Sequence, residues 1–335
     1  MAEQKQDGTL IEVRDLAISF FNKSGEVQAV RGIDYTLRRG EVLGIVGESG
    51  SGKSVSSHAI LRLTPPSGKV KSGQILFDGK DILQMSKKEI QALRGNRIAM
   101  IFQDPMTSLD PLFTVEYQIN ESLKKHTSLD ATSRKKRVIE LLELVGINQP
   151  ERRAKQYPYE FSGGMRQRVM IAMALSCDPE LLIADEPTTA LDVTIQAQII
   201  DLLKELKNRL GMAIIFITHD LGVVSDICDD IIVMYAGKIV ETGTKRDIFY
   251  QHKHPYTEGL LASVPDIDQD VAEKLVPIKG NPPDMSCVKA GCAFAPRCKY
   301  AMQACVREDP PLIEIEGTHA AACWKILRDA QQETA

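Results

Sequence analysis

One glycine-rich segment of the chain reads Gly47-Glu48-Ser49-Gly50-Ser51-Gly52-Lys53-Ser54. It fits the pattern G-x-x-x-x-G-K-[ST], in which the glycines let successive backbone N–H groups converge on phosphates without a Cβ in the way. Residues 41–46 precede it as a short apolar strand, and residues 53–63 follow it as a helix whose positive N-terminal end favours an anion. The sequence therefore predicts a phosphate-binding loop between a buried strand and a helix.

Two side chains of this phosphate loop would act directly on a bound nucleotide. Lys53 would reach the β- and γ-phosphates of ATP, and the hydroxyl of Ser54 would coordinate Mg²⁺. We expect ATP and Mg²⁺ as the ligands of this loop. The remaining contacts to the phosphates would come from the backbone of Gly47, Ser49, Gly50, Ser51 and Gly52.

Outward from the loop, short apolar stretches alternate with helical ones. Such alternation is typical of an α/β fold that has a parallel sheet with helices on its faces. The pattern turns helical from about residue 114 to 175, and the basic run at 134–137 is interpreted as a solvated helix face ahead of the apolar positions 138, 141, 142 and 145. The expected strands are residues 10–20, 27–37, 41–46, 73–77, 97–102, 181–184, 213–217 and 231–234, and the clearest helix is 195–210.

Two carboxylates end one of the apolar strands. Asp185 and Glu186 follow residues 181–184, a place where a pair of acids often begins a solvated loop. Beside a phosphate loop, Asp185 could instead hold Mg²⁺ through water and Glu186 could polarise the attacking water. His219 closes another apolar strand. Because a parallel sheet gathers its strand ends at the ligand crevice, His219 is a further candidate, although a single histidine is as often structural.

Composition and charge limit the kinds of protein this chain can be. Its 335 residues are 43% hydrophobic, which suffices for a sizeable core and predicts two domains or one large domain with an appendix. A net charge of −4 and a pI near 5.9 argue against a broad basic surface for nucleic acid. No apolar segment of a secretory signal opens the chain, and no apolar run approaches the roughly 20 residues that span a bilayer. We expect a cytosolic protein whose membrane path, if it acts in transport, comes from other chains.

Five of the seven cysteines crowd into the tail, where proline also rises and periodicity weakens. Cys292, Cys298, Cys305 and Cys323 are separated by five, six and seventeen residues, which misses the C-x-x-C pairs of zinc ribbons and the common ferredoxin spacings. In a reducing cytosol such a cluster favours a metal site. Free thiols or an oxidised pair are the alternatives that spacing leaves open.

One further motif makes a family recognisable. The stretch Phe161-Ser162-Gly163-Gly164-Met165-Arg166-Gln167-Arg168 resembles the signature motif of ABC ATPases, whose glycines open a helix that can bind a γ-phosphate. Phe161 and Met165 depart from the common Leu and Gln, but Ser162 and the glycine pair are intact. Other family elements follow in order: Gln103 resembles the Q-loop glutamine, Thr189-Ala190-Leu191-Asp192 the D-loop, His219 the H-loop histidine, and Phe20, with Phe21 as the alternative, the aromatic that stacks on adenine.

The resemblance covers about residues 10–250 and implies a fold and a mechanism. The fold would be a RecA-like P-loop ATPase core with an antiparallel β element and a helical subdomain at about 104–170 that contacts membrane subunits. We expect a nucleotide-binding domain at 1–250 and a small Cys-rich extension at 251–335. In the family two such domains pack head to tail around ATP, so that Ser162, Gly163, Gly164 and Asp192 of one face the phosphate loop of the other. Gln103 would also contact the Mg²⁺.

Narrower features resemble the subgroup that imports oligopeptides, dipeptides and nickel. They are residues 102–111 (Phe-Gln-Asp-Pro-Met-Thr-Ser-Leu-Asp-Pro), the form of the signature motif, and His254-Pro255-Tyr256-Thr257. The subgroup resemblance also implies a [4Fe–4S] cluster on Cys292, Cys298, Cys305 and Cys323, with zinc as the alternative metal and Cys287 as a spare thiol or substitute ligand.

The resemblance implies partners as well. They are two membrane permease subunits, a second ATPase subunit that is a paralogue or a copy of this chain, and an extracellular solute-binding protein reached through the permeases. The chain would then lie on the cytoplasmic face of the membrane as a peripheral ATPase that powers uptake of peptides, or of nickel or another small solute.

Other classes of ABC ATPase fit the sequence less well. The DNA-repair type inserts a long coiled coil between phosphate loop and signature, but only about 110 residues separate Lys53 from Ser162 here, without sustained heptads. The ribosome-acting type carries two ATPase domains in one chain. A regulatory subunit that binds ATP without hydrolysing it would not need Lys53, Glu186 and His219 together.

Overall fold

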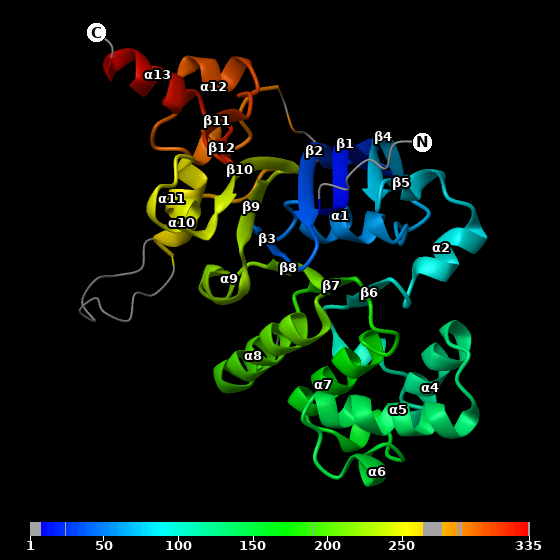
Figure 1. Ribbon diagram of the computed structural model, residues 1–335. Coiled ribbons are helices and arrows are strands. Elements are labelled where there is room, and N and C mark those ends of the chain that lie inside the picture. Colours follow the sequence, from blue (N-terminus) through cyan, green and yellow to red (C-terminus); the bar gives the residue numbers. More distant parts are fainter. Residues whose placement is uncertain are drawn as a thin grey trace. The chain divides into compact units, whose positions relative to one another are not determined.

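The computed structural model describes residues 8–23, 25–189, 191–263, 277–286, 288 and 290–333. The chain divides into two compact units, each assembled from several stretches (Figure 1). The signature motif and Glu186 belong to the first unit, and the phosphate loop and the C-terminal cysteines belong to the second. The first unit is Met1–Leu10, Leu37–Glu41 and Ile82–Ile217, and the second is Ile11–Thr36, Val42–Asp81 and Thr218–Ala335.

The second unit contains an antiparallel sheet with the strand order β2-β1-β4-β5. β1 pairs with β4 from Ile11 opposite Phe77 to Phe20 opposite Gly68, with a register shift after Arg14. Ile11 and Val13 are buried before the register shift and Leu16 and Ile18 after it, which is the period of a half-buried strand on either side of the irregularity. The strands are β1 (Thr9–Asn22), β2 (Gly25–Arg38), β4 (Gly68–Phe77) and β5 (Lys80–Asp81).

The same unit contains five strands of a mixed sheet, in the order β11-β12-β10-β9-β3. β3 and β9 run parallel, whereas β10 is antiparallel to both β9 and β12, and β11 is antiparallel to β12. All five residues of β3 are buried. The strands are β3 (Val42–Val46), β9 (Asp230–Tyr235), β10 (Lys238–Thr244), β11 (Ile313–Glu316) and β12 (His319–Ala321).

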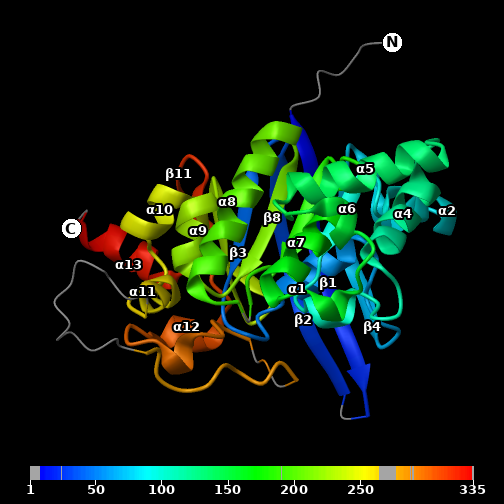
Figure 2. The ribbon, with the colours of Figure 1, turned by 90° about the horizontal axis from the view of Figure 1, so that it is seen from below.

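Short helices complete the second unit. α10 begins with a capping box in which Thr244 and Asp247 satisfy each other's backbone N–H groups. α10, α11, α12 and α13 gather at one end of the unit (Figures 1 and 2). The helices are α1 (Lys53–Ile60), α9 (Leu221–Ile227), α10 (Lys245–Tyr250), α11 (Pro255–Leu261), the 3-10 turn Ala295–Arg297, α12 (Gln303–Arg307) and α13 (Trp324–Glu333).

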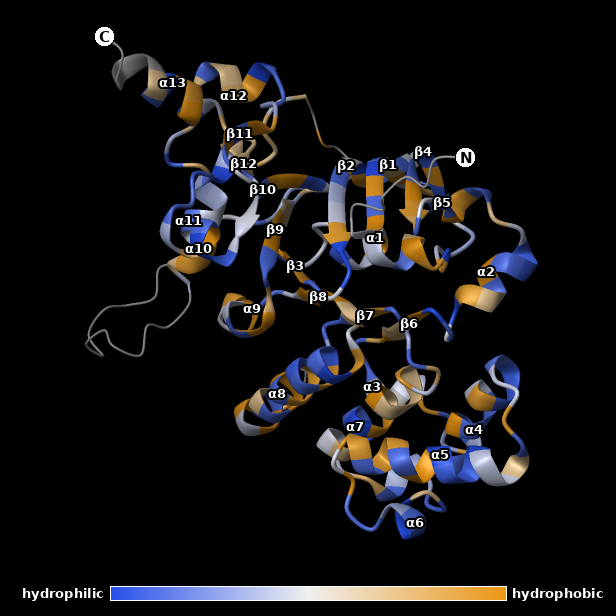
Figure 3. Cartoon of the chain, in the orientation of Figure 1, coloured by the Kyte–Doolittle hydropathy of each residue, from blue (hydrophilic) through white to orange (hydrophobic). Residues whose placement is uncertain are grey.

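The first unit contains three parallel strands in the order β8-β7-β6, namely β6 (Ile98–Ile101), β7 (Leu181–Asp185) and β8 (Ala213–Thr218). α8 (Val193–Leu210) connects β7 to β8. It is amphipathic, and the alternation of blue and orange along it in Figure 3 reflects a buried face formed by Ile199, Leu203 and Leu206.

A helical region completes the first unit. In it α4, α5 and α7 contact one another pairwise, α3 contacts α7, and α6 contacts α5 (Figure 1). Val138, Leu141, Leu142 and Val145 are fully buried, as predicted. In the basic run before them, Lys135 and Lys136 are exposed and Arg134 and Arg137 are partly buried. The elements are α2 (Lys87–Leu93), α3 (Pro105–Ser108), α4 (Val115–His126), α5 (Ala131–Leu144), α6 (Pro150–Arg153), α7 (Gly163–Ala174) and the 3-10 turns Ile82–Gln84 and Pro158–Glu160.

The predicted strands are found, with differences at their ends. The helix after the phosphate loop stops at Ile60, three residues early, because the chain turns through a left-handed Arg62 before two prolines. β4 begins at Gly68, five residues early, since its exposed polar start shows no apolar alternation and is extended by pairing with β1. β10, β11 and β12 were not predicted.

The C-terminal segment, residues 277–333, is not a unit of its own. It lies in the same compact unit as the phosphate loop, because β12 pairs with β10 and so extends the mixed sheet. The expected small appendix is therefore built into the core of the second unit. Within the described residues, no helix has both the length and the apolar character to cross a membrane.

The fully buried carboxylate of Glu241 on β10 holds the C-terminal segment in place through hydrogen bonds. Glu241 accepts hydrogen bonds from the backbone N–H groups of Lys253 (2.5 Å) and His254 (3.1 Å), and its Oε1 lies 3.0 Å from Nε2 of His319 on β12. A buried acceptor that serves three partners stabilises the structure only while all of them remain paired.

Replacing Glu241 by Ala should lower the free energy of unfolding by about 3 kcal/mol, because three polar groups, two of them on the buried His254 and His319, lose their acceptor. Urea unfolding followed by circular dichroism measures this. Glu314→Ala, at an exposed position on β11, is the matched control and should change stability by less than about 0.5 kcal/mol. Equal midpoints for the two variants would contradict the role of Glu241.

Candidate functional site

The phosphate loop passes through a space that admits no side chain. Gly47 has φ 150°, and a Cβ on it would lie 2.2 Å from the carbonyl oxygen of Met234 on β9. Gly52 has φ 98°, and a Cβ there would lie 2.4 Å from the carbonyl oxygen of Ala29 on β2. The N–H of Gly237 donates to the carbonyl of Ser51 (3.0 Å), so the β9–β10 turn also holds the loop. Packing alone therefore requires glycine at positions 47 and 52 of the motif.

Lys53 is buried and points back into this loop. Its Nζ donates to the carbonyl oxygens of Gly47 (2.7 Å) and Glu48 (2.9 Å). A lysine held over the loop in this way is placed to transfer its N–H groups to phosphate oxygens. Ser51 is buried beside it, and the hydroxyl of Ser54 is half-buried at the first turn of α1. Gly50 and Ser49 are exposed at the tip.

In the first unit, the acidic strand end and the Q-loop come together. Gln103 Nε2 donates to Glu186 Oε2 (3.0 Å), and the hydroxyl of Thr189 donates to the same oxygen (2.9 Å). Asp185 is buried at the end of β7. Glu186 has φ 48°, a left-handed conformation that costs energy in a residue with a Cβ and that recurs at functional sites. The geometry therefore orients one carboxylate with two donors, a use of Thr189 that the sequence did not predict.

The signature stretch begins α7. Ser162 is its N-cap, with the hydroxyl accepting from Met165 N (3.4 Å), and Ser162 and Gly163 are exposed, as a site for an external phosphate requires. A Cβ on Gly164 would lie 2.8 Å from Ile195 of α8, so this glycine allows the two helices to approach closely. The unusual Phe161 is buried, with Arg153 over its ring.

The remaining predicted residues take simple positions. Asp192 is the exposed N-cap of α8 and accepts from Ile195 N (2.9 Å). Ala190 of the D-loop lies outside the described residues. His219 is exposed directly after β8. Phe20 is half-buried against Gly68, whereas its neighbour Phe21 is exposed between Lys69 and Lys71, with Nζ atoms 5.6 and 5.3 Å from the ring centroid.

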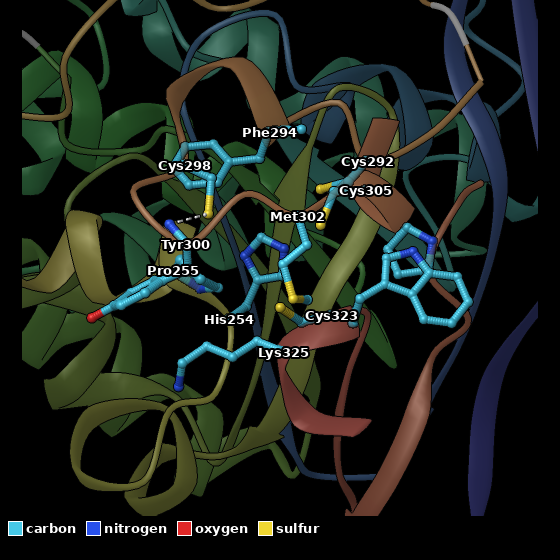
Figure 4. Close-up of a pocket in the computed structure, with 13 residues that line it drawn as sticks. His254, Pro255, Cys292, Phe294, Cys298, Tyr300, Met302, Cys305, Cys323 and Lys325 are labelled. Atoms are coloured by element: carbon cyan, nitrogen blue, oxygen red, sulfur yellow. Dashed lines mark hydrogen bonds between the residues drawn. The ribbon is translucent and has the colours of Figure 1, made fainter. Parts of the chain in front are cut away.

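The four predicted cysteine ligands line one pocket (Figure 4). All four are free thiols, so the oxidised pair is not seen. Burial raises the pKa of Cys292 to about 11 and raises the pKa of Cys298 and of Cys323 in the same direction, which keeps these thiols protonated unless a cation stabilises the thiolates.

The pocket is closely packed. Its cavity has a volume of about 10 Å³, room for one water molecule at most. Among the described residues, no three His, Cys, Asp or Glu side chains are gathered as a bound metal ion requires. The structure therefore does not confirm the predicted metal site. Cys287 lies outside the described residues.

Sequence reasoning missed two side chains that reach the phosphate loop from the C-terminal part of the second unit. The hydroxyl of Tyr256, in the motif at 254–257, accepts from Glu48 N (2.8 Å). Arg297 binds the carboxylate of Glu48 through two hydrogen bonds (2.6 and 2.9 Å). The motif at residues 254–257 was the sequence signal that could have identified Tyr256. Arg297 stands beside the predicted ligand Cys298 in the cysteine tail, but nothing in the sequence indicated its contact with Glu48.

Comparison with known proteins places these features in one family. Residues 30–189 match the family described as ABC transporter, and residues 240–305 match the oligopeptide/dipeptide transporter C-terminal region. The second match contains Tyr256, Arg297 and three of the four pocket cysteines.

Whole-length relatives agree with both matches. The chain is 57% identical over 322 residues to an oligopeptide transport ATP-binding protein, OppD, of Bacillus subtilis (96% of this chain, 90% of that one). It is 52% identical to the dipeptide transport ATP-binding protein DppD of the same organism (97% of each) and 51% identical to OppD of Salmonella typhimurium (96% and 95%).

Solved structures include a dimeric ATP-binding cassette in a post-hydrolysis state bound to ADP and Pi. It is 28% identical, with a TM-score of 0.64, and the match covers 71% of this chain and 99% of that one. The structure of cbiO1 from Clostridium perfringens, part of the ABC transporter complex cbiONQ, is 31% identical with a TM-score of 0.62 (72% and 91%). With the phosphate loop, the oriented Glu186 and near full-length relatives in agreement, this chain belongs to the ABC transporter family, among its oligopeptide and dipeptide transport ATP-binding proteins, and is an ATPase of the ABC cassette fold.

Proposed function

We propose that this chain is the ATP-hydrolysing subunit of an importer that takes up oligopeptides or dipeptides. The observation that carries the proposal is its identity of 57% over almost its whole length to an oligopeptide transport ATP-binding protein, including the C-terminal region specific to such transporters. Nickel or another small solute is the second candidate cargo.

Each residue of the ATPase site has a role in this proposal. Lys53 and the loop backbone bind the phosphates, and Ser54, Asp185 and Gln103 hold Mg²⁺ directly or through water. Glu186 polarises the attacking water, and its hydrogen bonds from Gln103 and Thr189 orient the carboxylate. His219 completes the set, and Phe20 or Phe21 stacks on adenine.

The signature residues act across a dimer of ATPase subunits. Ser162 and Gly163 are exposed at the N-terminus of α7, where unpaired backbone N–H groups favour a γ-phosphate. Asp192, exposed at the start of α8, faces the same partner. The partner is a copy of this chain or a paralogue.

The importer also contains two permease subunits, which the helical region at about 104–170 contacts, and a solute-binding protein. The chain lies at the cytoplasmic face of the membrane. Closure on ATP and reopening after hydrolysis drive the permeases between their two states.

Glu186→Gln should lower the ATP turnover rate by about 10²–10⁴-fold and leave MgATP binding intact, because the amide keeps the shape but does not accept a proton. Phosphate release at saturating MgATP measures turnover, and equilibrium titration measures binding. Glu205→Gln, on the exposed face of α8 in the same unit, is the control and should match the native rate. Unchanged turnover in Glu186→Gln would show that another group activates the water.

We also propose that Cys292, Cys298, Cys305 and Cys323 bind a [4Fe–4S] cluster, with zinc as the alternative. Four thiols from three stretches line one pocket, and thiolates are the preferred ligands of both. Because the cavity is small, loading would require these side chains to move apart. When bound, the cluster would supply a structural crosslink between these stretches.

Anoxically purified protein should contain iron and acid-labile sulfide, both of which Cys298→Ser should reduce severely by removing one of four ligands. Elemental analysis, sulfide assay and the visible absorption of the cluster measure this. Cys177→Ser, which alters a cysteine of the first unit, is the matched control and should keep native content. Zinc in place of iron supports the alternative metal, and metal-free native protein contradicts the site.

A further inference from the structure

Glu48, the second residue of the phosphate loop, is fixed from three directions. Its backbone N–H donates to the Tyr256 hydroxyl (2.8 Å), its carbonyl accepts from Lys53 (2.9 Å), and its carboxylate lies against Arg297. The position is one of the variable places in the loop pattern, so phosphate chemistry does not require an acid there. The contacts instead suggest that Glu48 sets the conformation of the loop.

Arg297 is built for this contact. Its guanidinium makes five hydrogen bonds: two to Glu48 (2.6 and 2.9 Å), one to the Tyr235 hydroxyl (3.2 Å), and two to the carbonyls of Lys279 (3.0 Å) and Ile278 (3.4 Å). Its side chain is only 6% exposed, against 26% for Glu48. A planar, bidentate pair of this kind fixes orientation in a way that lysine does not reproduce. The bond to Glu48 also raises the pKa of Arg297, so its charge is permanent.

The segment that carries Arg297 is itself anchored. Phe294 packs on Tyr256 and Tyr235, with ring centroids 5.4 and 5.3 Å apart, and the N–H of Cys292 donates to the carbonyl of Cys305 (2.8 Å). Residues 292–298 thus contact the loop in two ways: Phe294 supports the tyrosine that accepts from Glu48 N, and Arg297 holds the Glu48 carboxylate. Both contacts lie within the second unit.

We propose that Arg297 is a positioning residue for ATP binding, which acts through Glu48 to hold the phosphate loop in its binding conformation. The loop is rich in glycine and has little stiffness of its own, so ordering it before ATP arrives lowers the entropy cost of binding. Because Lys53 also bonds to the Glu48 carbonyl, a displaced Glu48 would misplace the lysine as well. This inference rests on the proposed ATPase function and deepens it.

The test is the affinity for a fluorescent ATP analogue, mant-ATP, with Mg²⁺, together with KM and kcat for ATP. Arg297→Gln should weaken analogue binding and raise KM by about tenfold, with kcat changed far less, because the residue does not touch the reacting atoms. Arg297→Lys should recover part of the affinity, since it keeps the charge and loses the fork. Lys299→Gln, which removes an exposed cation two residues along the same segment, is the matched control and should bind as the native protein does.

A second variant separates positioning from general destabilisation. Glu48→Gln breaks the same pair without altering the C-terminal segment, and it should weaken binding by a similar factor. The double variant Arg297→Gln with Glu48→Gln should be no weaker than the single ones, because both act on one interaction. Losses that multiply in the double variant, or native affinity in folded Arg297→Gln, would overturn the proposal. If the native protein itself does not bind mant-ATP, the proposed function fails rather than this inference.

Discussion

The structure depends on a loop that passes between two backbone carbonyls. A Cβ on Gly47 would lie only 2.2 Å from the carbonyl oxygen of Met234, and a Cβ on Gly52 only 2.4 Å from that of Ala29. A chain with side chains at these positions could not bring β2, β3 and β9 so close to the start of α1. The glycines therefore allow the antiparallel sheet and the mixed sheet to approach each other at this loop. One constraint thus governs the packing of the second unit at the loop that is proposed to bind ATP.

The same glycines create a need for support. A loop with glycine at positions 47, 50 and 52 has many accessible conformations, and fixing it costs more entropy than fixing an ordinary turn. The support comes from outside the loop: Gly237 from the β9–β10 turn, Tyr256 from α11, and Arg297 from the C-terminal segment. Glu241 in turn fixes the backbone just before α11 and joins it to β12. The C-terminal strands thus form part of the frame around the phosphate loop.

The sequence predicted those elements that short-range patterns of apolar and polar residues indicate. β3, β7 and β8 are continuous apolar runs followed by predicted site residues, so their positions were found within one or two residues. The contact between Gln103 and Glu186 joins two residues that the family order had already singled out. The sequence did not predict β10, β11 and β12, because the pairing of these strands with one another decides which of their residues are buried, and a single sequence does not show that pairing. The pair of Glu48 and Arg297 spans 249 positions, and an isolated ion pair leaves no periodic trace in a single sequence.

The motif at residues 254–257 shows how a pattern can be noticed before its purpose is understood. His254 is buried, which lowers its pKa to about 3, and the neutral ring accepts from Tyr256 N through Nδ1 (3.0 Å) as the N-cap of α11. Pro255 suits the first helical position, where no N–H is needed. These two residues orient Tyr256, whose hydroxyl reaches Glu48. Phe294 packs on the same tyrosine and lies between Cys292 and Cys298 in the sequence. Any change that moves these two cysteines apart therefore also acts on Tyr256, whose hydroxyl contacts the phosphate loop. Residues 292–298 are therefore constrained twice, by the thiols that they contribute to the pocket and by the loop that they support.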